Sequence, residues 1–162
     1  MCEERKRKMD IHIQLADIKY IDSCIDILQK SDLGKAYFRD HEKAADMLTY
    51  AVEHKNVYVA LNENRKCMGF IYYMTNGVFG SYPYLHIIAV KEEYRSCGIG
   101  KQLIKYFEDK ACDSSSAKYF LTVDDFNLRA KKLYETLGYK CVGELPDFYK
   151  MGINCYLMMK RT

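Results

Sequence analysis

The sequence has no tryptophan, only two prolines among its 162 residues, and no low-complexity tract. These absences argue against a fibrous or disordered protein, and the 49% apolar fraction is enough for a packed core. No apolar run approaches the roughly 18 residues that a membrane helix needs, and no apolar segment of the kind found in secretory signals follows the basic residues near the N-terminus. We therefore expect one globular domain and no membrane partner.

An excess of one charge is also missing. The 25 basic and 22 acidic residues are mostly interspersed, which argues against a dedicated nucleic-acid surface. The one basic run, 4–8, supports a nucleic-acid-binding accessory role only weakly, and that role would require strongly salt-dependent binding. We expect 1–10 to be a disordered basic tail, 11–162 to form the domain, and nucleic acid not to be a partner.

Seven cysteines are present, but their number is odd and no CxxC pair occurs. The four histidines are scattered as well, so the clustered ligands of a zinc site are missing. This pattern predicts reduced thiols in a cytoplasmic protein and no bound metal.

Apolar spacing predicts a succession of strands and helices. The expected strands are 11–15, 57–61, 68–75, 84–90, 119–123, 140–145 and 154–160, and the expected helices are 18–28, 44–55, one from about residue 99, and 127–137. Residues 31–38 are expected to be a loop, and 76–83 a break that contains two glycines and a proline. The resulting order, βααβββαβαββ, is an α+β fold with a mixed sheet.

The most informative segment is RSCGIGKQL, which follows an apolar strand and opens an amphipathic helix. Gly98 and Gly100 allow close approach of the backbone, and the first amides of a helix point outward, so the segment predicts an anion site. Arg95 and Lys101 add positive charge. A Walker A loop is excluded because Arg95 and Gln102 occupy the positions of its first glycine and its Ser or Thr. A dinucleotide fingerprint is excluded as well, because its third glycine is replaced by leucine.

The same segment resembles the Q/R-x-x-G-x-G/A signature of the GNAT N-acetyltransferase superfamily. About thirty residues later, NLRAKKLYETLGY is similar to the second signature of that family, N-x-x-A-x-x-x-Y-x-x-x-G-F/Y. The residues in register are Asn127, Ala130, Tyr134, Gly138 and Tyr139. The resemblance covers about 11–160 and implies a mixed, mostly antiparallel sheet flanked by helices, in which the fourth and fifth strands splay apart to admit acetyl-CoA.

The resemblance also implies a set of acetyl-CoA contacts. Three backbone positions on the fourth strand would pair with the pantetheine arm, the glycine loop would bind the pyrophosphate, and two residues after the fifth strand would complete the site. In order these are Ile88, Ala89 and Val90; then Arg95, Ser96, Cys97, Gly98, Ile99, Gly100 and Lys101; then Asn127 and Tyr134. Asn127 would equally suit the N-cap of a helix.

Acetyl transfer to an amine needs a proton for the leaving thiolate and removal of a proton from the amine. By resemblance, Tyr134 is the candidate acid, with a buried core tyrosine as the alternative. His86 resembles a histidine of the arylalkylamine branch that removes a proton through water, although a structural histidine is an equal alternative. The ribosomal-protein branch uses a strand glutamate where this chain has Thr122, although the region of Tyr149 resembles that branch.

We therefore expect an acetyl-CoA-dependent N-acetyltransferase that transfers acetyl directly to a primary amine of a small molecule or of a peptide N-terminus. The alternative is an inactive acyl-CoA-binding sensor. A homodimer through the last strands would be consistent with the resemblance.

Overall fold

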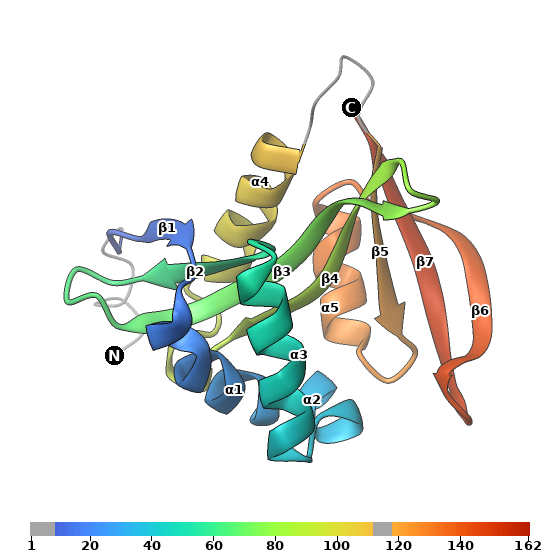
Figure 1. Cartoon of the computed structure of the whole chain (residues 1–162). Helices are drawn as coiled ribbons and strands as arrows, with labels where there is room; N and C mark the ends of the chain where they lie inside the picture. Colours follow the sequence, from blue (N-terminus) through green and yellow to red (C-terminus); the bar gives the residue numbers. More distant parts are fainter. Residues whose placement is uncertain (1–8, 112–117) are drawn as a thin grey trace. The chain divides into compact units, whose positions relative to one another are not determined.

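The structure, a computed structural model, describes residues 9–111 and 118–162 (Figure 1). The predicted basic tail therefore lies almost entirely outside the described residues. The described part forms two compact units: unit 1 contains residues up to Tyr72 together with Ile87–Phe107, and unit 2 contains Tyr73–His86 together with Glu108–Thr162. Seven strands follow one another in the order β1-β2-β3-β4-β5-β7-β6, and β3 and β4 contribute to both units.

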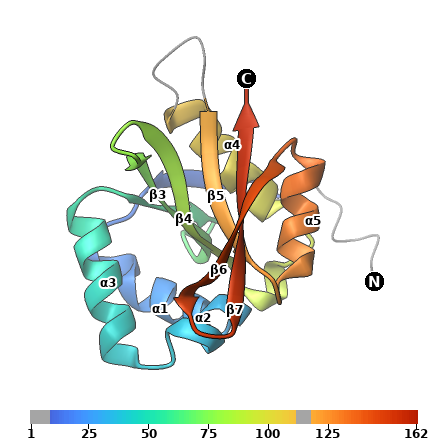
Figure 2. The ribbon, with the colours of Figure 1, turned by 90° about the vertical axis from the view of Figure 1, so that its right-hand side faces the viewer.

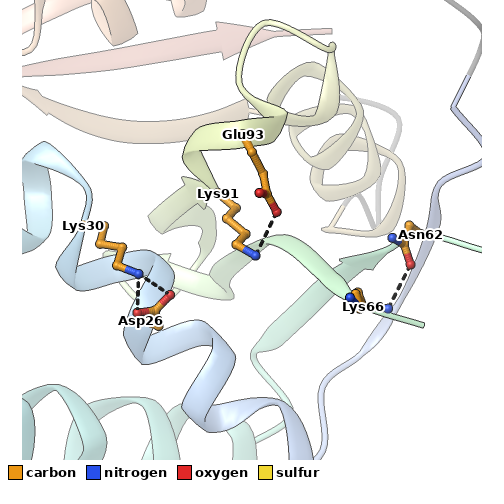
Figure 3. Close-up of polar contacts among 6 residues, drawn as sticks. All are labelled: Asp26, Lys30, Asn62, Lys66, Lys91 and Glu93. Carbon is orange, nitrogen blue, oxygen red and sulfur yellow. Dashed lines mark hydrogen bonds and ion pairs between the residues drawn. The ribbon is translucent and has the colours of Figure 1, made fainter. Parts of the chain in front are cut away.

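Unit 1 begins with an antiparallel arrangement of β1 (His12–Leu15), β2 (Val57–Leu61) and the first part of β3 (Cys67–Val78). The two strands expected over 57–61 and 68–75 are found, and they pair as an antiparallel hairpin. Its turn is held by Asn62, whose Oδ1 accepts from the Asn64 amide at 3.0 Å and from the Lys66 amide at 2.9 Å (Figure 3). This side-chain bonding to nearby amides explains why an asparagine opens the turn.

Three helices lie between β1 and β2: α1 (Ile21–Gln29), α2 (Asp32–Tyr37) and α3 (His41–Glu53). Asp17 caps a short 3₁₀ helix, η2 (Ile18–Tyr20), which leads into α1. The helices α1 and α3 lie side by side (Figures 1 and 2).

The expectation of a loop over 31–38 is wrong, because α2 occupies most of it. Ser31 caps α2 through its side chain, which accepts from the Gly34 amide at 3.0 Å. A Cβ on Gly34 would lie 1.8 Å from the Leu28 carbonyl oxygen, so this glycine allows α2 to fold tightly against the end of α1. Six residues are too few to show helical periodicity, and the glycine suggested a break.

Unit 2 contains β5 (Lys118–Asp124), α5 (Leu128–Thr136), β6 (Lys140–Lys150) and β7 (Ile153–Arg161). β7 lies between β5 and β6 and pairs antiparallel with both (Figure 2). α5 packs near β5, and Gly138, with φ +94°, follows its C-terminus as predicted. β6 is longer than expected because strand pairing resumes at Lys150, beyond an irregularity after Leu145.

The predicted break over 76–83 is also shorter than expected, because β3 continues to Val78 and β4 (Tyr82–Val90) begins before the proline. A Cβ on Gly77 would lie 2.7 Å from the Tyr84 Cβ, so this glycine permits a close approach of two strands rather than a turn. Polar residues and glycines inside an exposed ribbon obscured the strand pattern.

β4 pairs in parallel with β5 at two positions, Tyr84 with Phe120 and Leu85 with Leu121. Within the described part of unit 2 the next residues along, His86 and Thr122, are not paired. This early end of pairing agrees with the expected splay of the fourth and fifth strands. α4 (Ile99–Ala111) follows β4, and its residues Leu103, Phe107 and Ala111, spaced four apart on one face, are buried.

The predicted order of elements is therefore found, with α2 as the addition, in a mixed sheet of seven strands flanked by helices. Among the described helices, none is both long and apolar enough to cross a membrane.

Candidate functional site

The glycine loop lies in unit 1, between β4 and α4. After a short 3₁₀ helix, η3 (Glu92–Tyr94), the backbone takes positive φ at Ser96 (+64°) and at Gly98 (+83°). Apart from Gly98 and its two chain neighbours, no heavy atom of the described residues lies within 4 Å of the Cβ that Gly98 would carry, so the loop is open on that side. Ile99 is 1% exposed and fixes the start of α4 in the core. The loop is thus bent and open, but anchored at the helix.

The first amides of α4 are suited to bind an anion. The first hydrogen bond at this helix start runs from the Gln102 amide to the Gly98 carbonyl at 3.1 Å. The amides of Ile99, Gly100 and Lys101 precede it, so the helix itself offers them no acceptor. Together with the positive end of the helix dipole, they have the geometry that suits an anion.

Two cations near this loop are already oriented. Arg95 Nε donates to the Val90 carbonyl at 3.2 Å, which uses one of the five donors of its guanidinium. Lys91, in contrast, forms an ion pair with Glu93 at 2.8 Å (Figure 3). The side chain tied directly to the strand before the loop is therefore Arg95, as the motif predicts.

The last residues of β4 have backbone amides on the edge of the strand that faces away from β3. Lys91 N–H donates to the Met68 carbonyl of β3 at 2.8 Å. Successive backbone amides of a strand point to opposite sides, so the amide of Ala89 points toward β3 like that of Lys91. The amides of Ile88 and Val90 therefore point away from β3. They are placed to pair with an extended ligand, as the resemblance implies for the pantetheine arm.

In unit 2, Tyr134 is carried by α5 and is only 6% exposed. Its ring meets the ring of Tyr139 edge-on, with centroids 6.0 Å apart. Burial raises the pKa of the Tyr134 phenol, so this hydroxyl stays protonated at neutral pH. Tyr134 is therefore protonated, as an acid must be. A tyrosine with a purely structural role in the core would have the same burial and the same protonation state.

Asn127 has the structural role that the sequence allowed. Its Oδ1 accepts from the Ala130 amide at 3.3 Å and so caps α5. The side-chain NH₂ group takes no part in this bond, so Asn127 can cap α5 and donate a hydrogen bond to a ligand at the same time.

His86 lies on β4 in unit 2 and is half-buried, as strand alternation predicts. Its ring centroid lies 5.9 Å from that of Tyr84. Burial lowers the pKa of the imidazole, so His86 is neutral at pH 7 and can accept a proton.

Three hydroxyl groups that the sequence analysis did not combine meet beside His86. The Tyr84 hydroxyl lies 2.9 Å from Thr122 Oγ1 and 2.7 Å from the Tyr149 hydroxyl, and the last two lie 3.3 Å apart. We call these three residues the hydroxyl cluster. Burial raises the pKa of Tyr84, and proximity to Tyr149 raises it further. Two features of the sequence pointed to this place: Thr122, which stands where the ribosomal-protein branch has a glutamate, and the region of Tyr149, which resembles that branch.

The hairpin that carries Tyr149 is tied to the end of β5. Asp125 Oδ2 accepts from the Asn154 amide at 3.2 Å, and Asn154 Oδ1 accepts from the Asp147 amide at 3.2 Å. Asp147 has φ +48°, and its carboxylate accepts from the Gly152 amide at 2.6 Å. This chain of bonds fixes the hairpin from which Tyr149 reaches the cluster.

Asp124, at the end of β5, is buried and accepts from the Cys155 thiol at 3.0 Å. Burial and this carboxylate together raise the pKa of Cys155 to about 12. Asp124 therefore belongs to the interior of unit 2 and not to a solvated turn.

A separate polar cluster stabilises unit 2. Glu108 accepts from the Lys160 ammonium at 2.7 Å and from the Tyr139 hydroxyl at 3.0 Å, while its backbone carbonyl accepts from the Tyr119 hydroxyl at 2.7 Å. It thereby links α4 to β5, to β7 and to Tyr139, the residue before β6. Within the described residues, no group of three or more His, Cys, Asp or Glu side chains is arranged to hold a metal ion.

Comparison with known sequences assigns the family. The sequence profile described as the acetyltransferase (GNAT) family matches residues 21–139, which include the glycine loop, Asn127 and Tyr134. The chain belongs to the GNAT acetyltransferase family. The two motifs that carried the resemblance thus lie in the matched region.

Two curated relatives of this GNAT chain carry different substrate names. A thialysine N-epsilon-acetyltransferase from Sus scrofa is 38% identical over 81 residues, which cover 50% of the chain but only 48% of the relative. The match therefore spans about half the length of that relative. An N-alpha-acetyltransferase from Sulfolobus acidocaldarius is 28% identical over 98% of the chain and 96% of its own length.

Solved structures agree with the GNAT fold. A GNAT acetyltransferase from Bacillus cereus superposes with a TM-score of 0.74 at 17% identity, over 94% of this chain and 98% of that one. A chain of a NatC complex, solved with a Gag peptide and CoA, superposes with a TM-score of 0.73 at 20% identity, over 95% and 99% of the two chains. At these identities the likeness concerns the fold alone.

Proposed function

We propose that this GNAT chain is an N-acetyltransferase that transfers the acetyl group of acetyl-CoA directly to a primary amine. The observation that carries the proposal is the loop from Arg95 to Gly100. Its positive φ at Gly98, its open side and the first amides of α4 support an anion site there, within the residues that the family profile matches.

The residues present fit acetyl-CoA. The pyrophosphate would bind the amides of Ser96 to Lys101 and the guanidinium of Arg95, because both supply donors and positive charge. The amides of Ile88 and Val90, with Ala89 between them, would pair with the pantetheine arm in the manner of an added strand. Asn127 would contact the same arm through its NH₂ group while it caps α5.

The reaction needs a nucleophilic amine, and therefore an uncharged one. Its nitrogen forms a bond to the thioester carbon, the carbon–sulfur bond breaks, and the sulfur takes up a proton. Tyr134, kept protonated by burial, would supply the proton to the sulfur. His86, kept neutral by burial, would receive the proton that the amine nitrogen loses, directly or through water.

The acceptor is a small-molecule amine or a peptide N-terminus. The relatives named above support both, since one is named for an N-epsilon and one for an N-alpha transfer. The five described cysteines are free, which supports a reducing compartment such as the cytoplasm. A homodimer remains a prediction for size-exclusion chromatography with light scattering.

Calorimetric titration with acetyl-CoA, run beside a free-thiol release assay against amines and peptide N-termini, tests the proposal. We expect binding and thiol release on at least one amine class. Binding without release would favour the acyl-CoA sensor instead, and absence of binding would refute the assignment of the glycine loop.

A further inference from the structure

Unit 1 contains two cysteines whose thiols meet. Cys24 lies in α1, Cys67 is the first residue of β3, and their side chains are hydrogen-bonded to each other. The other described cysteines bond to oxygen atoms: Cys97 and Cys141 to backbone carbonyls, and Cys155 to a carboxylate. The Cys24–Cys67 pair differs from them because each sulfur has another sulfur as its partner.

The two thiols of this pair differ in acidity. The hydrogen bond with Cys67, together with burial, raises the pKa of Cys24, so this thiol keeps its proton. The hydrogen bond from Cys24 lowers the pKa of Cys67, and the Gly69 backbone and the Lys91 ammonium lower it further, against the opposing effect of burial. Because the thiolate is the nucleophilic form of cysteine, Cys67 is the more reactive of the two and Cys24 is its hydrogen-bond donor.

Cys67 is also the thiol nearer to the surface. It is 8% exposed, against 1% for Cys24. The side chain of Lys91 is 40% exposed and forms its ion pair with Glu93 (Figure 3). Glu93, and more weakly Asp26 of α1, raise the pKa of Lys91, so this ammonium lies near α1 as well as near Cys67. The narrow exposure of Cys67 suits a reagent of two or three heavy atoms better than a bulky one.

The start of β3 is irregular, which leaves room for the two sulfurs to move together. A disulfide needs them about 2 Å apart, closer than any hydrogen bond brings them. In the pairing with β2, Ala60 lies opposite Gly69 and Leu61 opposite Cys67, so Met68 is an extra residue with no counterpart on β2. Such a bulge disrupts the ladder locally. Cys67 can therefore shift toward α1 with less loss of strand pairing than a residue in the middle of β3.

We propose that Cys24 and Cys67 form a redox site, which a small peroxide oxidises to a reversible disulfide between α1 and β3. With hydrogen peroxide, the Cys67 thiolate attacks one oxygen, the O–O bond breaks, and the other oxygen leaves as hydroxide, which takes up a proton. Cys67 is then a sulfenic acid. The Cys24 sulfur attacks the Cys67 sulfur, the S–O bond breaks, and the leaving hydroxide takes the Cys24 proton. In total the two thiols lose two electrons, and one peroxide becomes two water molecules.

Peptide mapping of the whole protein tests the proposal. The folded protein is treated with hydrogen peroxide, the remaining thiols are alkylated in urea, and the chain is digested with trypsin without reductant. Cys24 and Cys67 fall in separate tryptic peptides, 20–30 and 67–91, each with a single cysteine. We expect these two peptides to be joined, with the loss of two hydrogen atoms, and to separate after treatment with dithiothreitol. The link should be about tenfold more abundant than any link to Cys97 or Cys141.

Variants separate the roles of the two thiols. Cys24→Ala removes the sulfur that forms the disulfide, so Cys67 should remain a sulfenic acid, which dimedone traps when the oxidised protein is unfolded in urea. Cys67→Ala removes the thiolate, so Cys24 should stay reduced. The matched control is Cys155→Ala, which removes another buried thiol, the one that donates to Asp124, and should leave the link unchanged. Peptide mapping of the unsubstituted protein decides the proposal even if a variant fails to fold.

Thermal unfolding supplies a second measurement. A bond between Cys24 and Cys67 closes a loop of the unfolded chain and lowers its entropy, so the oxidised protein should unfold at a higher temperature than the reduced one. Cys24→Ala should show no such rise.

Three results would overturn the proposal: both thiols still reduced when the exposed Cys141 is oxidised, either thiol linked mainly to another cysteine, or a linked form that unfolds no later than the reduced protein. Because none of these measurements uses acetyl-CoA, their outcome is independent of the proposed acetyl transfer.

Discussion

Replacement of Gly98 by alanine is expected to weaken acetyl-CoA binding through the backbone. Gly98 has φ +83°, and no other part of the described chain comes within 4 Å of its Cβ position, so the new methyl group meets no clash there. The cost is therefore conformational, about 1 to 2 kcal/mol for a non-glycine residue in the left-handed region. If the loop relaxes to a negative φ, binding must restore the bent form, and Kd should rise about 5- to 30-fold.

Gly152 provides a matched control. It has φ +85°, and among the described residues beyond its two neighbours none comes within 4 Å of its Cβ position, but it belongs to the turn between β6 and β7. Gly152→Ala should lower the free energy of unfolding by a similar amount, because its backbone is strained in the same way, and it should leave the Kd for acetyl-CoA unchanged. The assay is calorimetric titration of both variants beside thermal unfolding. Equal Kd values for Gly98→Ala, Gly152→Ala and the unsubstituted protein would refute the anion-site argument.

Three further expectations concern stability and reactivity. Glu108→Ala leaves the part-buried Lys160 ammonium without its carboxylate and should destabilise by about 2 kcal/mol, visible in urea unfolding. Because the folded pKa of His86 is lowered, the unfolded state takes up the proton first; stability should fall as pH drops below about 6.5, and His86→Gln should reduce that fall. Cys141, exposed, should be alkylated before Cys155, which is buried with its pKa raised to about 12; mass spectrometry of a time course would show the reverse order if this is wrong.

Much of the fold was predictable because its elements are long and patterned. The helix α4 showed its buried face in the spacing of Leu103 and Phe107, and the β2–β3 hairpin showed two apolar runs around Asn62. Where the pattern was short or interrupted, the prediction was wrong. The helix α2 has six residues, and its close packing at Gly34 depends on the Leu28 carbonyl, which no local pattern reveals.

Only the part of the candidate site that lies in the two sequence motifs was predictable. The loop with Gly98 and the cap at Asn127 could be found because local backbone geometry requires those residue types. The hydroxyl cluster could not, because Tyr84 and Tyr149 are 65 residues apart and meet only through the pairing of β5, β7 and β6. The resemblance of the region around Tyr149 did not show that its hydroxyl would meet that of Tyr84.

The most direct test of acetyl transfer is mass spectrometry of the acceptor. The purified protein is incubated with acetyl-CoA carrying an isotopically labelled acetyl group and with small amines and peptides that have free N-termini, and the products are fragmented to locate the label. The account predicts one labelled acetyl group on an amine nitrogen of at least one acceptor, formed in proportion to released CoA. Unmodified acceptors, with acetyl-CoA bound but intact, would contradict it.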